Sequence, residues 1–190
     1  MQKINFKQSP LAWFCAVLFA MSVFSPQAQA LPRGGAYVYI VYTMKYKKVK
    51  KTLKAAIPSS IKAKFYNADL LTVADYSGKQ KAVSKFERAQ LVVFIGDETI
   101  KLLEGSELKI PVLIVNSGLQ DVKSRKVVTY LFDKAHASAA PSGLSKTSLA
   151  TAAELKPGTV GEKDAVVIIG QKDDAFWKEV AAVVEKLLAR

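Results

Sequence analysis

Two apolar runs that each end at a glycine constrain the fold of this chain more than any other feature. The first, Leu-Val-Val-Phe-Ile, precedes Gly96, and the second, Ala-Val-Val-Ile-Ile, precedes Gly170. An acidic pair and an amphipathic stretch follow each run within a few residues. A strand that is apolar at every position is buried on both faces, which is typical of a parallel sheet covered by helices. The two runs therefore predict central strands of an α/β fold.

Further stretches complete an alternation of strands and helices. Additional strands are predicted at 36–42, 61–66, 110–115 and 126–132, and helices at 45–57, 79–88, 97–105, 119–124 and 173–188. Residues 61–66 alternate apolar and polar side chains, which indicates an edge or near-edge strand with one wet face. This order predicts a three-layer, doubly wound α/β sandwich around a mostly parallel sheet of five to six strands.

Residues 133–161 differ in composition from the rest of the chain. They are rich in Ala, Ser, Thr, Pro and Gly and poor in large apolar side chains. We expect a long loop with one weak helix at 146–155, and such loops are usually functional or mobile. The segment contains His136, the one histidine of the chain, which we interpret as an exposed bystander.

The first 30 residues have the pattern of a cleavable export signal. Lys3 and Lys7 precede an apolar core at 11–24, and Ala28-Gln29-Ala30 matches a small-x-small cleavage site. The core is shorter than the roughly 20 residues of a spanning helix. We therefore expect cleavage after Ala30, a periplasmic location, one α/β domain at 31–190, and no transmembrane segment once the signal is removed. Because Cys15 is the only cysteine, the mature chain is predicted to form no disulfide.

Positive charge is concentrated near the start of the mature chain. The formal net charge is +12, and no acidic residue precedes Asp69. The helix predicted at 45–57 carries six lysines: Lys45, Lys47, Lys48, Lys50, Lys51 and Lys54. The simplest interpretation is a solvated helix face. The alternative is a surface that docks an acidic partner or an anionic membrane. A nucleic-acid partner is not expected, because no binding motif for one is present.

The sequence offers no recognised catalytic constellation. It contains no dinucleotide-binding glycine motif, no phosphate-binding loop and no nucleophile elbow. A single histidine provides no histidine metal cluster, and the sequence singles out no Ser-His-Asp set. The acidic pairs Asp97-Glu98 and Asp173-Asp174 are explained by helix capping. We therefore predict a protein that is not an enzyme and holds no cofactor or metal.

The predicted ligand site lies where the strands end. Parallel strands place their carboxyl ends at one edge of the sheet, where doubly wound proteins bind ligands. Amides at the helix start after Gly96 suit a carboxylate, phosphate or carbonyl. The adjacent acidic pair favours a neutral or zwitterionic ligand. The predicted ligand-binding residues are Tyr42, Thr43, Gly96, Asp97, Thr99, Asn116 and Ser117.

Three segments together resemble the first lobe of type I periplasmic substrate-binding proteins of ABC transporters. They are the strand at 37–42 with its helix, the Leu91–Ile95 strand with Gly96, and the Ile-Pro-Val-Leu-Ile-Val strand at 110–115. The resemblance covers residues 36–117 and implies a flavodoxin-like lobe that contacts a small solute through its strand tips. Those proteins clamp the solute between two lobes, whereas this chain has the length of one. The resemblance implies a non-catalytic accessory protein that binds a small ligand. The alternative is an adaptor that docks an envelope protein or the membrane surface through its lysine-rich helix.

Overall fold

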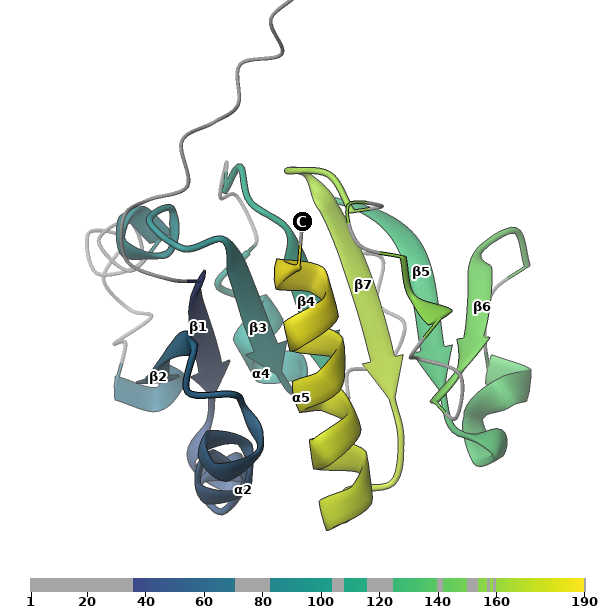
Figure 1. The fold of residues 1–190 in the computed structure, drawn as a ribbon, viewed down its shortest axis with the longest axis horizontal. Coiled ribbons are helices and arrows are strands. Elements are labelled where there is room, and N and C mark those ends of the chain that lie inside the picture. Colours follow the sequence, from purple (N-terminus) through teal and green to yellow (C-terminus); the bar gives the residue numbers. More distant parts are fainter. Residues whose placement is uncertain are drawn as a thin grey trace, which may run out of the picture. The chain divides into compact units, whose positions relative to one another are not determined.

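In the part of the chain that the computed structural model describes, seven parallel strands form one sheet in the order β2-β1-β3-β4-β7-β5-β6 (Figure 1). The structure describes residues 36–70, 83–103, 108–115, 125–139, 142–149, 154–156, 158 and 160–189. The strands are β1 (Ala36–Tyr42), β2 (Ile61–Asn67), β3 (Leu91–Ile95), β4 (Val112–Val115), β5 (Lys126–Phe132), β6 (Ser145–Ser148) and β7 (Asp164–Ile169). The helices are α2 (Val49–Ala56), α4 (Asp97–Ile100) and α5 (Asp174–Leu188), with 3-10 helices η1 (Met44–Tyr46), η2 (Ala68–Leu70) and η3 (Lys134–Ala139).

The predicted α/β class is confirmed, and β6 accounts for the strand beyond the five to six expected. The weak helix predicted at 146–155 is wrong where the structure describes it, because Ser145–Ser148 pairs in parallel with β5. This strand was missed because it lies at the edge of the sheet and is composed of polar residues. An edge strand of this kind shows no apolar alternation. The predicted signal at 1–30 and the helix at 119–124 lie outside the described residues.

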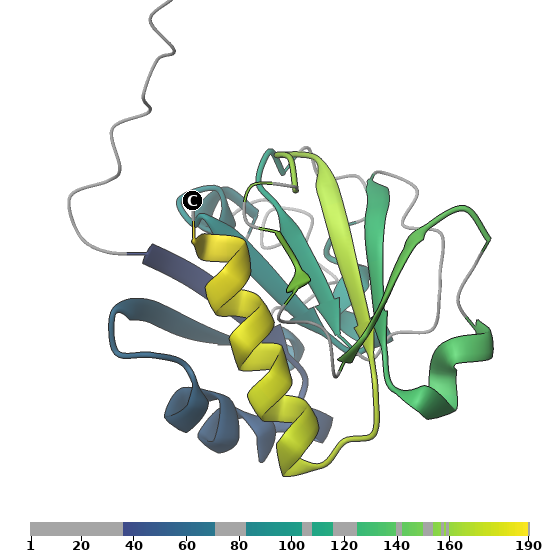
Figure 2. The same cartoon turned by 45° about the vertical axis from the view of Figure 1, so that its right-hand side comes forward.

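Apolar side chains cover both faces of the sheet. On one face, α2 and α5 lie over the sheet (Figures 1 and 2). Leu53 of α2 and Val180 of α5 belong to the same buried apolar cluster as Ile40 and Val93. Strand alternation sends the neighbouring residues to the other face, where Phe94 packs with apolar residues of the helical stretch at 83–86 and of α4 with the turn after it, at 97–103. β3 and β4 are buried at every position because both faces are covered. Among the described helices, none combines the length and the apolar character needed to cross a bilayer.

The chain changes direction across the sheet at two strand pairs. β1 is followed by β2 on one side, whereas its other neighbour, β3, is followed by β4 farther along the sheet. Likewise, β5 is followed by β6 at the edge, whereas β7 leads into α5, which packs back against α2 (Figure 2). Open α/β sheets bind ligands at such switch points, outside the carboxyl ends of the strands. The β1/β3 and β7/β5 pairs are therefore both places to look for a site.

An aromatic ring lies against the glycine that ends each apolar run. A Cβ atom on Gly96, which has φ +89°, would lie 2.6 Å from Cε2 of Tyr46. A Cβ atom on Gly170 would overlap Cδ2 of Phe176. Trp177 connects the two contacts, since its ring lies 4.9 Å from that of Phe176 and 6.4 Å from that of Tyr46. Glycine is therefore required at both strand ends by the close approach of these rings.

Replacing Gly170 with alanine tests this packing. We expect Gly170→Ala to lower the free energy of unfolding by about 1–3 kcal/mol, because the new methyl group overlaps the Phe176 ring. Urea titrations of the single variants and of Gly170→Ala/Phe176→Ala give the coupling between the two sites. Gly170→Ala should lower the free energy of unfolding much less in the Phe176→Ala background than in the wild type. An equal cost in both backgrounds would show that the ring is not the reason for the glycine.

Candidate functional site

The residues predicted to bind a ligand at the β1/β3 switch point are largely packed into the fold. Tyr42 and Thr43 are buried, and Thr99 is fully buried. The Thr99 hydroxyl donates to the Gly96 carbonyl at 2.7 Å, and the Gly96 amide donates to the Val115 carbonyl at 2.9 Å. These hydrogen bonds use the Thr99 hydroxyl and the amide and carbonyl of Gly96 within the fold.

The other residues predicted for that site differ in their positions. Asp97 is exposed in the first turn of α4, next to Glu98, whose Oε1 lies 3.9 Å from Nζ of Lys45. Thr43 Oγ1 is buried and has no hydrogen-bond partner among the described residues. Asn116 and Ser117 lie outside the described residues. The structure therefore brings Tyr42, Thr43, Gly96, Asp97 and Thr99 to the carboxyl ends of β1 and β3, as the sequence predicted.

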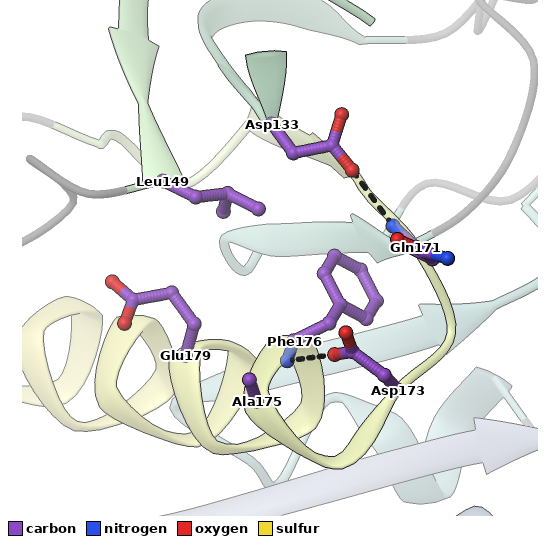
Figure 3. Close-up of a pocket in the computed structure, with 7 residues that line it drawn as sticks. All are labelled: Asp133, Leu149, Gln171, Asp173, Ala175, Phe176 and Glu179. Carbon is purple, nitrogen blue, oxygen red and sulfur yellow. Dashed lines mark hydrogen bonds between the residues drawn. The ribbon is translucent and has the colours of Figure 1, made fainter. Parts of the chain in front are cut away.

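A cavity of about 310 Å³ lies at the other switch point, between the carboxyl ends of β5 and β7 and the first turns of α5 (Figure 3). Carboxylates, a glutamine and apolar groups line it: Asp133, Leu149, Gln171, Asp173, Ala175, Phe176 and Glu179. Its size lies at the lower end of the range typical of small-molecule sites. Gln171, Asp173 and Ala175 are exposed, so the cavity is open to solvent on that side. Phe176 is buried, with its ring directed between Leu149 and Gln171 (Figure 3).

Asp133 ties the two strand ends of this cavity together. Its Oδ2 accepts a hydrogen bond from the Gln171 amide at 2.8 Å, immediately after β7. Its Oδ1 lies 2.6 Å from Nδ1 of His136 and accepts from the His136 amide at 3.1 Å. Because a carboxylate only accepts hydrogen bonds, Nδ1 carries the proton in this contact. His136 is therefore not a bystander as predicted, and it holds a carboxylate that lines the cavity.

The pKa values of two carboxyl groups that line the cavity, Asp133 and Glu179, are shifted in opposite directions. Burial acts to raise the pKa of Asp133, but hydrogen bonds from the His136 side chain and the Gln171 amide, together with the charge of His136, leave that pKa below its ordinary value. Burial raises the pKa of Glu179, and the charge of Lys186 only partly opposes this. Asp133 is thus held as a carboxylate by partners inside the protein. Glu179 lacks such stabilisation and gains from a cation in the cavity.

Asp173 caps the helix that forms one wall of the cavity. Its Oδ1 accepts a hydrogen bond from the Phe176 amide at 2.8 Å, which satisfies one of the free donors in the first turn of α5. The capping role predicted for Asp173 is confirmed. The cap also fixes the start of the helix that carries Ala175, Phe176 and Glu179. Figure 3 shows these side chains on the cavity side of the helix.

The lysines that the sequence assigned to a partner surface lie apart from the cavity lining. All six, at positions 45, 47, 48, 50, 51 and 54, are exposed. Val49 and Leu53 are buried against the sheet, so Lys50, Lys51 and Lys54 occupy the outer side of α2. The other three lysines precede α2, Lys45 in η1 and the remaining two in the turn at 47–48. Lys45 approaches Glu98, and Lys50 lies 5.9 Å from the centre of the Phe65 ring.

The cavity lies at the carboxyl edge of the sheet, where the sequence also placed its predicted ligand site, but at a different switch point. None of the seven lining residues was predicted as a site residue, and Asp173 was predicted only as a helix cap: Asp133, Leu149, Gln171, Asp173, Ala175, Phe176 and Glu179. One usable signal was the Asp-x-x-His spacing of Asp133 and His136 directly after a predicted strand. A second was the repetition of the glycine-ended strand at Gly170. Among the described residues, no group of three or more His, Cys, Asp or Glu side chains is arranged to hold a metal ion.

Comparison with known proteins assigns no relative, since no family model and no curated protein matches the chain.

Substituting Asp133 tests whether the described contacts hold the cavity together. At neutral pH, Asp133→Asn should lower the free energy of unfolding by about 1–2 kcal/mol, because a charged acceptor shared by two segments is lost. The pKa of Asp133 is lower in the folded than in the unfolded chain, so its contribution is complete above the ordinary value of 3.8 and is lost as the pH falls through the folded value. When unfolding is measured as a function of pH, the free energies of unfolding of the wild type and of Asp133→Asn should become equal only in acid. The exposed Asp174→Asn variant is the control. If the difference in free energy of unfolding between the two proteins persisted unchanged below the folded pKa of Asp133, the stabilising role given to this carboxylate would be contradicted.

Proposed function

We propose that this chain is an exported, non-catalytic accessory protein that binds a small ligand in the cavity between β5, β7 and α5. One observation carries the proposal: an open cavity of about 310 Å³ lies at a switch point of the sheet, lined by three carboxylates and a buried aromatic ring. The position agrees with the rule that open α/β sheets bind ligands outside their strand ends. The proposed function is the small-ligand binding expected from the sequence, but the proposed site is at β7/β5 instead of β1/β3.

The lining favours a ligand with a positive charge and a short apolar body. Asp133, Asp173 and Glu179 are the ionisable groups that line the cavity, and all three are acidic. Phe176, Leu149 and Ala175 supply apolar surface, and an aromatic face also attracts cations. A protonated primary amine or a quaternary ammonium ion with a short alkyl chain satisfies both features. Because one side of the cavity is open, a bound ligand keeps part of its surface in water, and the affinity should be modest.

The resemblance to a lobe of type I periplasmic substrate-binding proteins supports the proposed class. In those proteins a solute contacts strand tips of each lobe. A single lobe that binds at its own strand tips would serve as an accessory in solute handling, with a partner closing the site. The signal pattern at 1–30 supports export to the periplasm.

A ligand panel combined with a cavity-filling variant tests the proposal. Thermal unfolding with a panel of small amines, neutral alcohols and carboxylates should show stabilisation by amines first. Ala175→Leu adds volume from an exposed helix position directly into the cavity, and it should weaken binding of the best amine by about tenfold or more. Ala182→Leu makes the same change on the same face of α5, about two turns further along, at an exposed position that does not line the cavity, and it should leave binding unchanged.

Removing one charge separates the role of the carboxylates from that of cavity shape. Glu179→Gln keeps the size of the side chain and should weaken amine binding about threefold to tenfold, while binding of a neutral analogue stays the same. Glu185→Gln, on the exposed surface of α5, serves as the matched control. The absence of stabilisation by every compound, or equal binding to the wild type and Ala175→Leu, would refute the proposal.

A further inference from the structure

We infer that the outer side of α2, together with Met44 and Lys172, is a docking surface for an anionic lipid bilayer. This surface consists of the six lysines at positions 45, 47, 48, 50, 51 and 54, with Met44 and Lys172. Lys172 stands between the lining residues Gln171 and Asp173 of the β5/β7 cavity, whereas the six lysines and Met44 are not part of that lining. The proposed surface does not depend on the proposed ligand.

The charge of this surface is of one sign along the sequence, and two carboxylates border its Met44 end: Glu98 lies 3.9 Å from Nζ of Lys45, and Asp69 accepts a hydrogen bond from the Met44 amide. Lysines take six of the ten positions from 45 to 54, and every one of them is exposed. At about 100° per residue, the lysines at 47–54 fall within an arc of about 160° on the side opposite the buried Val49 and Leu53. No acidic residue precedes Asp69 in the sequence. The cations therefore face outward together.

A lysine from a distant part of the chain joins this surface. Lys172 lies in the connection between β7 and α5, and its Nζ is 5.1 Å from the centre of the Tyr46 ring. The Nζ of Lys45 is 5.8 Å from the same ring. The Tyr46 side chain is itself buried. The ring thus brings two cations, which are remote in sequence, to the same end of α2.

An exposed apolar side chain favours a bilayer over a soluble anion. Met44 is 53% exposed, and it is the one large hydrophobic side chain exposed among the described residues. It directly precedes the lysines at 45, 47 and 48. The apolar face of α2 is buried against the sheet, so the helix itself cannot sink into a membrane. The arrangement fits peripheral attachment, in which lysines contact lipid phosphates and a single thioether enters the boundary region.

Vesicle binding tests this inference. The full mature chain should co-sediment with vesicles of phosphatidylglycerol and phosphatidylethanolamine, but not with vesicles of phosphatidylcholine. Binding should decrease steeply with added salt, because the attraction is electrostatic. Since each lysine near an anionic surface contributes about fivefold in affinity, the triple variant Lys47→Glu/Lys48→Glu/Lys51→Glu should bind at least about 50-fold more weakly.

Two further variants decide between a bilayer and other anions. Lys109→Glu/Lys126→Glu/Lys163→Glu changes the net charge equally at exposed positions away from α2, and it should retain most of the binding. Met44→Ser keeps the charge and should weaken vesicle binding about threefold to tenfold, without affecting binding to soluble polyglutamate. Equal losses in the two lysine variants would overturn the proposal in favour of net charge alone. Vesicle binding that Met44→Ser leaves unchanged would overturn it in favour of a soluble polyanion or an acidic protein. Circular dichroism of each variant confirms that it remains folded.

Discussion

The close contact between aromatic rings and glycine backbone at the carboxyl ends of β3 and β7 is the constraint on which the rest of the structure depends. Tyr46 lies against Gly96 and Phe176 lies against Gly170, at distances that exclude a Cβ atom. Trp177 packs beside both rings. These contacts set the position of η1 and of the start of α5 on the sheet, and so they determine which part of the carboxyl edge is filled and which part stays open.

The same packing has different consequences at the two switch points. At β1/β3, buried Tyr42 and Thr99 join the Tyr46 ring, and backbone hydrogen bonds of Gly96 use its polar groups within the fold. At β7/β5, the Phe176 ring forms one wall of a cavity, and Asp133 bridges the strand ends through Gln171 and His136. A doubly wound sheet offers similar strand ends at both points. The side chains that happen to fill them decide where a ligand fits.

The apolar strands and the amphipathic α5 could be predicted because burial on both faces of a sheet, or on one face of a helix, leaves a direct pattern in the sequence. β6 could not be predicted, since Ser145–Ser148 is a polar edge strand that pairs through its backbone alone. The edge of the sheet that holds the candidate site was predicted, but the cavity was not. Its lining combines residues up to 46 positions apart in the sequence, from Asp133 to Glu179. No local sequence pattern indicates that the Tyr46 ring fills one switch point while the Phe176 ring leaves space at the other.

We propose that the open part of the carboxyl edge, at β7/β5, selects cations. The most direct test is a titration of isotope-labelled protein with n-butylammonium, n-butanol and n-butyrate, followed by amide chemical shifts in NMR spectra. We predict saturable shifts for Gln171 and for residues 173–176 with the ammonium ion, smaller shifts with the alcohol and none with the carboxylate, while amides of residues 96–99 stay unchanged. Shifts that gather at residues 96–99, or that do not depend on the charge of the compound, would contradict the account.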